Sequence, residues 1–348
     1  MHSLVAQKNW VTLPEPDLAA LRLADEKRPR NLFAAPLPLD ISPANAGSWV
    51  NNNGVNGRWE CHFHLASTAG LALYFDQLQL PAGGQLFLRN AQGQQGPFTQ
   101  ANVSEHGLLF TGFLPGNTVT LVYEGPVWPA NHDPFHCWRA DHVYKPEYYD
   151  SSKRLLDFGT ANACHLNANC PLGDGWEDQK RGTARIIVVV AEGAGYCSGN
   201  LINNTAANGR PYLLTGLHCQ AGFTPLYDLW RFDFGFRAPA CATPNNAPTF
   251  TSYSGALFRA SWEASDFLLL ELTDPTFNAV NHFFAGWDRS DGPVSGATIA
   301  FHHPMGDLQK LGFSPNSATI INNSITWNNN ASYPCGPPLF DELLSWNF

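Results

Sequence analysis

The chain has 348 residues, enough for two domains with sizeable cores, and its 44% hydrophobic content excludes a disordered protein. The net charge of -9 comes without any basic run, which argues against nucleic acid and anionic membrane surfaces as partners. The longest strongly apolar run, 186–191, is far too short to span a bilayer, so we expect no membrane partner.

Composition also bears on fold class and compartment. With 26 Pro, 30 Gly and only 14% charged residues, the chain favours short strands joined by turns, so an all-β fold is expected. Eight cysteines suit an oxidising compartment, and we expect an extracellular, secreted protein. No charged segment followed by an apolar one opens the chain, so a signal peptide is not visible. Either the start is missing or export uses another route.

The N-terminal part divides into a leading segment and a region of strands. Segment 1–44 contains one predicted helix, 16–27, and ends in a proline-rich stretch. Region 45–127 repeats short strand patterns with turn residues between them, which predicts a β-sandwich. The predicted strands are 58–65, 71–75, 85–88, 107–111 and 118–123. The alternative is that this sandwich is an independent carbohydrate- or protein-binding module.

Segment 128–162 is rich in Pro, His, Asp and Tyr and is predicted to be a linker. Metal-capable side chains occur in this segment and on one face of the strand 58–65; they are His132, His136, Cys137, His142, His62 and His64. Their spacing matches no ligand pattern, so we expect no metal. Cys137 is expected instead to pair with Cys61.

The stretch 197–219 concentrates the chemistry of the chain. The apolar run 211–215 predicts a strand that delivers His218 to its end beside Cys219, and Cys197 lies on the preceding strand across an Asn/Gly-rich turn. A Cys197–Cys219 disulfide would fix the base of the loop that carries the imidazole. The alternative is a core histidine beside a structural cystine.

An acidic residue follows 48 residues after His218, where Asp266 directly precedes the predicted apolar strand 267–272. A carboxylate in this place can hold a histidine tautomer and stabilise its imidazolium form. The alternative is a local turn bond at a strand entrance.

These motifs resemble a known family. Thr215-Gly-Leu-His-Cys is similar to the T-A-x-H-C motif of trypsin-like serine peptidases, and Cys197-Ser-Gly-Asn-Leu-Ile-Asn-Asn-Thr looks like their bacterial lysyl endopeptidase branch. Further similar segments are 163–175, Ala285-Gly-Trp-Asp-Arg, 301–310 and, in the propeptide region of that family, 75–88 and 96–102. Asp266 matches the family's aspartate in S/D-F-x-L-L-E-L.

The resemblance implies a β-sandwich prodomain in a zymogen, followed in 163–348 by a trypsin-like double β-barrel whose first barrel spans about 181–275. Activation cleavage would fall near 155–163, where the mature enzyme begins. In the family pattern Cys170 pairs with Cys241, and Cys164 lacks its partner here.

The same resemblance assigns catalytic roles in a secreted serine-type endopeptidase that acts on protein or peptide substrates. His218 is the general base and then the general acid, Asp266 orients it, and Cys335 stands at the nucleophile position. His302 and His303 are expected to be structural because the base is already assigned. The chemistry requires no metal and no organic cofactor.

The nucleophile motif departs from the family's G-x-S-G-x-P. Cys335 replaces the serine, and Tyr333, restricted by Pro334, replaces a glycine whose N–H helps to form the oxyanion hole. The sequence stops 13 residues after Cys335, so the second barrel looks incomplete and the chain resembles a truncated or degenerate copy. Cys335 could instead be structural, in the place of the missing partner of Cys164. The alternative function is then an inactive homologue that acts as a binding module.

Overall fold

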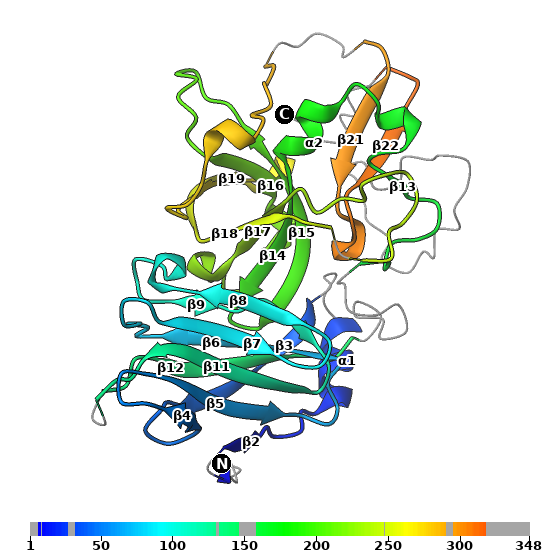
Figure 1. Cartoon of the computed structure of the whole chain (residues 1–348). Helices are drawn as coiled ribbons and strands as arrows, with labels where there is room; N and C mark the ends of the chain where they lie inside the picture. The colour runs from blue at the N-terminus through cyan, green and yellow to red at the C-terminus, as the bar shows by residue number, and fades with distance from the viewer. Residues whose placement is uncertain are drawn as a thin grey trace.

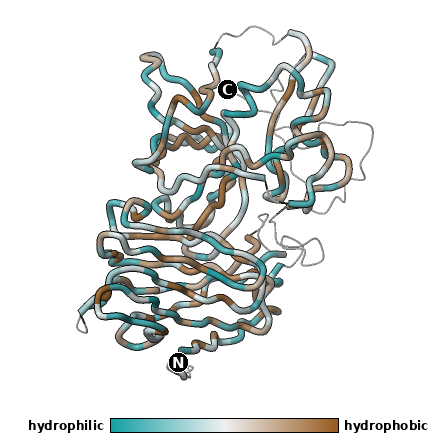
Figure 2. Tube along the Cα trace, viewed as in Figure 1, coloured by the Kyte–Doolittle hydropathy of each residue, from teal (hydrophilic) through white to brown (hydrophobic). Residues whose placement is uncertain are grey.

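The computed structural model describes residues 6–7, 9–26, 32–129, 132–145, 158–246, 248–289 and 295–317. Strands predominate over a few short helices, which confirms the predicted all-β fold. The N-terminal strands form a stacked, layered half and the following strands a curled sheet beside it (Figure 1). Hydrophobic segments run along the strands in both halves, as expected for two packed cores (Figure 2).

The first layer of the N-terminal half is a sheet in the order β1-β2-β5-β11-β7-β8, with β4 paired to β5. Its strands are β1 Ala6–Gln7, β2 Trp10–Thr12, β4 Ser48–Asn52, β5 Asn56–His64, β7 Gln85–Arg89, β8 Gln94–Phe98 and β11 Thr118–Pro126. On β5, Trp59, Cys61 and Phe63 are buried while the residues between them are more exposed. This alternation with a period of two is what a strand with one buried face requires.

The second layer runs β10-β6-β12-β3, with β9 paired to β6. Its strands are β3 Leu32–Ile41, β6 Gly70–Asp76, β9 Leu109–Phe110, β10 Leu114–Pro115 and β12 His136–Val143. Phe75 and Cys137 of this layer share one core with Cys61 and Phe63 of the first. The N-terminal half is therefore a β-sandwich. The predicted helix is present as α1 Leu18–Glu26, and the short helix η1 Gln100–Asn102 lies between β8 and β9.

The sandwich extends beyond the predicted region 45–127 at both ends. Strand β3 falls in the leading segment 1–44, and strand β12 falls in the expected linker 128–162. Pro36 and Pro38 fit within β3 because β15 pairs only with Leu32 and Ala34. The stretch that contains the prolines therefore has a neighbouring strand, β12, on one side only. In β12, Arg139 and Asp141 form a buried ion pair. Because these two buried positions are charged, the sequence of β12 lacks the apolar pattern by which a strand is predicted.

The C-terminal half begins with a curled antiparallel sheet in which β15 pairs with β14 and β16, β14 continues to β17 and β18, and β16 continues to β20 and β19. Its elements are α2 Glu177–Gly182, β14 Thr183–Val190, β15 Gly193–Ile202, β16 Tyr212–Gly216, η4 Leu217–Cys219, η5 Tyr227–Leu229, β17 Arg231–Phe234, β18 Thr251–Ser254, β19 Ala256–Trp262, η6 Glu263–Ser265 and β20 Phe267–Leu272. Every residue of β14 is buried, so this strand forms the centre of the core.

A smaller sheet in the order β13-β22-β21 lies beside the curled sheet (Figure 1). Its strands are β13 Leu166–Asn167, β21 Thr298–His302 and β22 Lys310–Ser314. The short helix η3 Pro171–Gly173 follows β13 along the chain, η8 Pro304–Gly306 connects β21 to β22, and η7 Ala279–Asn281 lies between β20 and β21. Ala168, Phe301 and Leu311 form its separate small core. This sheet is the part of the expected second barrel that the structure describes.

The two halves share one hydrogen-bonded sheet. Strand β3 pairs with β12 of the sandwich on one side and with β15 of the curled sheet on the other, so the sheet continues from one half into the next. Within the described ranges, no helix is long and apolar enough to cross a membrane.

Candidate active site

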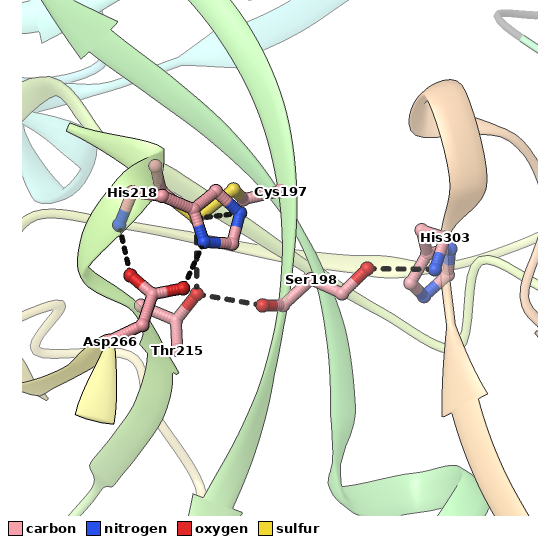
Figure 3. The surroundings of a disulfide bond; sticks show 7 residues. Cys197, Ser198, Thr215, His218, Asp266 and His303 are labelled. Atoms are coloured by element: carbon pink, nitrogen blue, oxygen red, sulfur yellow. Dashed lines mark hydrogen bonds and ion pairs between the residues drawn. A yellow bond between two sulfur atoms is a disulfide. The ribbon is translucent and has the colours of Figure 1, made fainter. Parts of the chain in front are cut away.

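His218 lies at the end of strand β16, as the sequence predicts. The strand ends at Gly216, and the single turn η4 then carries the histidine. A disulfide between Cys197 of β15 and Cys219 closes the base of this turn across 22 residues of sequence, which confirms the predicted pairing. The turn is thus anchored covalently to the neighbouring strand, next to the imidazole (Figure 3).

Asp266 is brought to His218 by the pairing of two strands. Phe267, the first residue of β20, is opposite Gly216, the last residue of β16. Asp266, just before Phe267, and His218, two residues after Gly216, therefore meet at the same edge of the sheet. Asp266 adopts the left-handed conformation, with φ 53°, which turns the chain from η6 into β20. Aspartate tolerates this conformation better than most residues.

The carboxylate of Asp266 accepts two hydrogen bonds from His218. The ring Nδ1 is 2.5 Å from Oδ2, and the backbone N–H donates to Oδ1 at 2.7 Å. The backbone carbonyl of Asp266 also accepts a bond from the N–H of Leu217 at 2.8 Å. A carboxylate on Nδ1 holds the proton of a neutral imidazole there, so Nε2 is left as the proton acceptor. The side chain of His218 is 47% exposed, so this acceptor can meet a substrate.

Gly216 is a site residue that sequence analysis missed. A Cβ at this position would lie 2.6 Å from both Cε1 and Nδ1 of the His218 ring and 3.4 Å from Oδ2 of Asp266. The ring occupies the space that a side chain would need, so glycine permits this ring position. The signal was visible in the sequence, because Gly216 stands where T-A-x-H-C has alanine.

A chain of hydrogen bonds connects this site to the smaller sheet. The buried hydroxyl of Thr215 donates to the carbonyl of Ser198 at 2.7 Å, and the hydroxyl of Ser198 accepts from the N–H of His303 at 2.8 Å (Figure 3). Thr215 precedes the histidine turn and His303 follows strand β21. The position of the second sheet is therefore coupled to the strand that carries the site.

His303 is buried and His302 is half-buried, and both are neutral. Burial lowers the pKa of His303 to about 3 and that of His302 to about 4, where repulsion by His165 and Lys310 adds to the effect. The ring Nδ1 of His303 bonds to the carbonyl of Asp307 at 2.9 Å. A histidine that stays neutral throughout the physiological range and faces the interior is a structural residue.

A buried ion network ties the same region together. Arg185 donates to Oδ2 of Asp233 at 2.7 and 3.0 Å and to the carbonyl of Gly306 at 3.1 Å, and Arg231 donates to Oδ1 of Asp233 at 2.7 Å. Burial alone would raise the pKa of Asp233, but the two guanidinium groups outweigh it and lower the pKa to about 2. The carboxylate is therefore charged at any pH at which the protein would act.

The structure gives a mixed result for the other cysteines. Cys170 pairs with Cys241, as the family pattern implies. Cys164 is also disulfide-bonded, so the expectation that it lacks a partner is wrong. Cys61 and Cys137 are free and buried, so the pairing expected for them is wrong as well. Burial raises the pKa of the Cys61 thiol to about 12 and also raises that of Cys137, so neither is a nucleophile at neutral pH.

Three histidines of the sandwich have ordinary polar partners. His62 and His64 bond to the hydroxyls of Thr120 and Thr118, both at 2.9 Å, and His136 bonds to Asp76 at 2.7 Å. In the described part of the chain, the close metal-capable group is Cys197, His218 and Cys219. Both of its sulfurs belong to one disulfide, so the group has no thiolate to offer a metal.

Cys335, Tyr333 and Pro334 lie outside the described residues, so of the predicted site residues the structure describes His218 and Asp266. A family model described as lysyl endopeptidase, C-terminal domain, matches residues 158–335. This match covers slightly more than half of the chain. It includes His218 and Asp266, ends at Cys335, and leaves the N-terminal sandwich outside.

Proposed function

The chain belongs to the lysyl endopeptidase family, and on this premise we propose that it is a secreted endopeptidase whose catalytic residues are His218, Asp266 and Cys335. Protein or peptide chains are its substrates, and water is the second reactant. One observation carries the proposal: within the matched residues, Asp266 lies 2.5 Å from Nδ1 of a histidine that is itself half exposed.

In the proposed reaction, which requires Cys335 as a reduced thiol, Nε2 of His218 takes the proton from that thiol as the sulfur attacks the scissile carbonyl carbon. The carbonyl oxygen becomes an oxyanion, and Asp266 stabilises the imidazolium that forms. The imidazolium then gives its proton to the leaving amine as the C–N bond breaks. Water attacks the thioester in the same way, with His218 as the base, and the acid product leaves with the thiol restored.

A thiol suits this scheme because a histidine can hold cysteine as a thiolate. Tyr333 departs from the family, which uses the N–H of a glycine at that position to stabilise the oxyanion; tyrosine also carries a backbone N–H, but Pro334 restricts Tyr333 to extended conformations and so restricts the direction in which that N–H points. Loss of one such donor costs about 100-fold to 1,000-fold in kcat. We therefore expect a slow enzyme compared with relatives that carry the complete motif.

The second candidate function is a catalytically inactive homologue that binds a protein or peptide. The observation that favours it is the disulfide at Cys164, because each of the other described cysteines is either free or paired in Cys170–Cys241 or Cys197–Cys219. A Cys164–Cys335 disulfide, one of the alternatives raised by the sequence, would leave no thiol to attack the substrate. The two candidates thus differ in one chemical property, the redox state of Cys335.

Secretion and a zymogen form belong to the same proposal. The disulfides Cys170–Cys241 and Cys197–Cys219 are stable in an oxidising compartment such as the extracellular space. The N-terminal sandwich is proposed as the prodomain, and the peptidase domain as the part that begins near residue 163. Extracellular localisation would be checked by following the tagged protein in culture medium.

Hydrolysis of a defined protein substrate tests the function. Purified protein is incubated with a denatured substrate, and new peptide termini are identified by mass spectrometry. The proposal expects cleavage by the natural chain and none by the His218→Ala variant. Intact substrate in both samples, with binding of the substrate retained, supports the inactive homologue instead.

A further inference from the structure

The N-terminal sandwich and the curled sheet meet through strand β3. Ala34 of β3 is opposite Ala194 of β15, and Leu32 is opposite Gly195. A Cβ on Gly193 would lie 2.2 Å from the carbonyl oxygen of Ala34, and its φ of 151° is one that side chains rarely allow. The backbones of the two halves therefore approach as closely as neighbouring strands of one sheet, at a glycine that permits it.

The hydrophobic core is also continuous across this junction. One cluster of buried side chains contains residues of the sandwich together with those of β14, β15 and β17. The sandwich contributes Leu32, Phe33, Ala34, Ala72, Tyr74, Phe110, Phe113 and Val143. The ring of Phe33 stacks on Tyr196 of β15 with centroids 4.4 Å apart. Separation of the halves would expose this apolar surface to water, which opposes dissociation.

Buried polar contacts add a second attachment. Arg139 of β12 is almost fully buried and donates to the carbonyl of Val190 at the end of β14, at 2.8 Å. Its guanidinium group also bonds to Asp141, which is fully buried as well. If the halves separated, the Val190 carbonyl would lose this partner, and the Arg139–Asp141 pair would become accessible at a new surface. At the rim, His106 of the sandwich bonds to Asp228 at 2.8 Å.

The junction leaves the candidate active site open. With the sandwich in place, the side chain of His218 is still 47% exposed. The contacts of the sandwich reach the start of β15, the end of β14 and the segment around Asp228. They act as a support for the curled sheet, and they do not cover the imidazole.

We propose that the N-terminal sandwich is a permanent subunit of the mature protein, which stays bound through β3 after activation cleavage near residues 155–163. Its partner is the curled sheet of the same molecule. This proposal is independent of catalysis and deepens the zymogen proposal: cleavage would free a chain end while the fold keeps both pieces together.

A cut of the full-length chain tests this directly. A recognition sequence for a site-specific protease is inserted between residues 145 and 158, in a His218→Ala background so that the outcome does not depend on the chain's own activity. After complete cleavage, size-exclusion chromatography and native mass spectrometry should show one complex of both fragments. Separate elution of the two folded fragments, or loss of the sandwich with aggregation of the other fragment, overturns the proposal.

Two matched variants test whether the contact between β3 and β15 holds the two fragments together. Phe33→Ala removes the ring that stacks on Tyr196 and should weaken association of the cut fragments at least about 100-fold. Phe258→Ala, on the exposed face of the edge strand β19, should leave association unchanged. Circular dichroism before cleavage confirms that each variant is folded. Equal retention in folded Phe33→Ala and Phe258→Ala proteins contradicts the assignment to this junction.

Discussion

His218 and His303 lie on two sheets joined by the hydrogen bonds of Ser198, yet their surroundings give them opposite properties. His218 is half exposed and its Nδ1 faces a carboxylate, whereas His303 is buried and its Nδ1 faces a backbone carbonyl. A carboxylate stabilises the imidazolium that forms when Nε2 accepts a proton. Burial without such a charge opposes it and lowers the pKa of His303 to about 3. The difference teaches that exposure and partner, more than residue type, decide which histidine can cycle a proton.

The largest expected effect comes from removing the base. His218→Ala should lower kcat/KM for peptide hydrolysis on the order of a millionfold, because it removes the proposed general base. His303→Gln is the matched control, and the activity of its folded fraction should stay within about tenfold of the natural chain. The comparison fails if the two variants lose activity equally when both are folded.

The next effect tests the carboxylate. Asp266→Asn keeps the size of the side chain but removes the charge that orients His218, so kcat should fall about 10,000-fold. The amide can favour the wrong tautomer of the imidazole, in which Nε2 carries the proton. Steady-state kinetics on the folded variant measure the change. An unchanged kcat would show that the bond of 2.5 Å has no part in catalysis.

Acid should destabilise the protein through His302 and His303. The pKa values of His303 and His302 are lowered from 6.5 to about 3 and about 4, so the unfolded chain takes up protons below pH 6.5 before the folded protein does. Their contribution to stability is complete above pH 6.5 and is lost as the pH falls toward 4, by about 1.4 kcal/mol per pH unit for each group.

Denaturant unfolding between pH 7 and pH 4 measures this dependence. In His303→Gln the slope should be smaller by about one proton, because glutamine does not titrate. His64→Gln is a suitable control, since His64 lies on the outer face of β5 and is not fully buried. A slope that is the same in His303→Gln and in the natural chain would show that His303 does not stay neutral in the folded protein.

The smallest of these effects concerns Gly216. Gly216→Ala brings a methyl group to 2.6 Å from the present position of the His218 ring, so the ring must shift, but the T-A-x-H-C motif carries alanine at this position and kcat should fall by no more than about tenfold. Gly286→Ala is the control because a Cβ there meets no atom within 4 Å. A shift of the His218 ring resonances in NMR spectra, absent in the control, accompanies the loss. Full activity of Gly216→Ala would mean that the ring has room elsewhere.

The sequence predicts the site where the signal is local. Cys197, Cys219 and His218 lie on or next to adjacent strands joined by one turn. Asp266 directly precedes an apolar strand, and the motif S/D-F-x-L-L-E-L identifies it as the family's aspartate. All-β composition is equally local, because it reflects turn residues and alternating burial. The Cys197–Cys219 disulfide and the all-β class needed no knowledge of distant contacts, whereas Asp266 was linked to His218 through the family motif.

The missed features depend on tertiary contacts. Strand β12 contains the buried ion pair Arg139–Asp141. Arg139 also donates to the carbonyl of Val190 in the C-terminal half, and this contact, which helps to compensate for the burial of the charge, is not visible in the sequence. Cys61 and Cys137 face one core on opposite sheets, but shared burial does not establish the geometry of a disulfide. The role of Gly216 appears only when the ring of His218 is placed beside it.

The central claim is that the His218–Asp266 pair activates the residue at position 335. Its most direct test is the rate at which Cys335 reacts with iodoacetamide at pH 7, followed by peptide mass spectrometry in the natural chain and in His218→Ala. The account predicts rapid alkylation of Cys335 in the natural chain and much slower alkylation without the imidazole. A Cys335 that resists alkylation until the protein is reduced, or that reacts equally in both proteins, would contradict the claim and favour the inactive homologue.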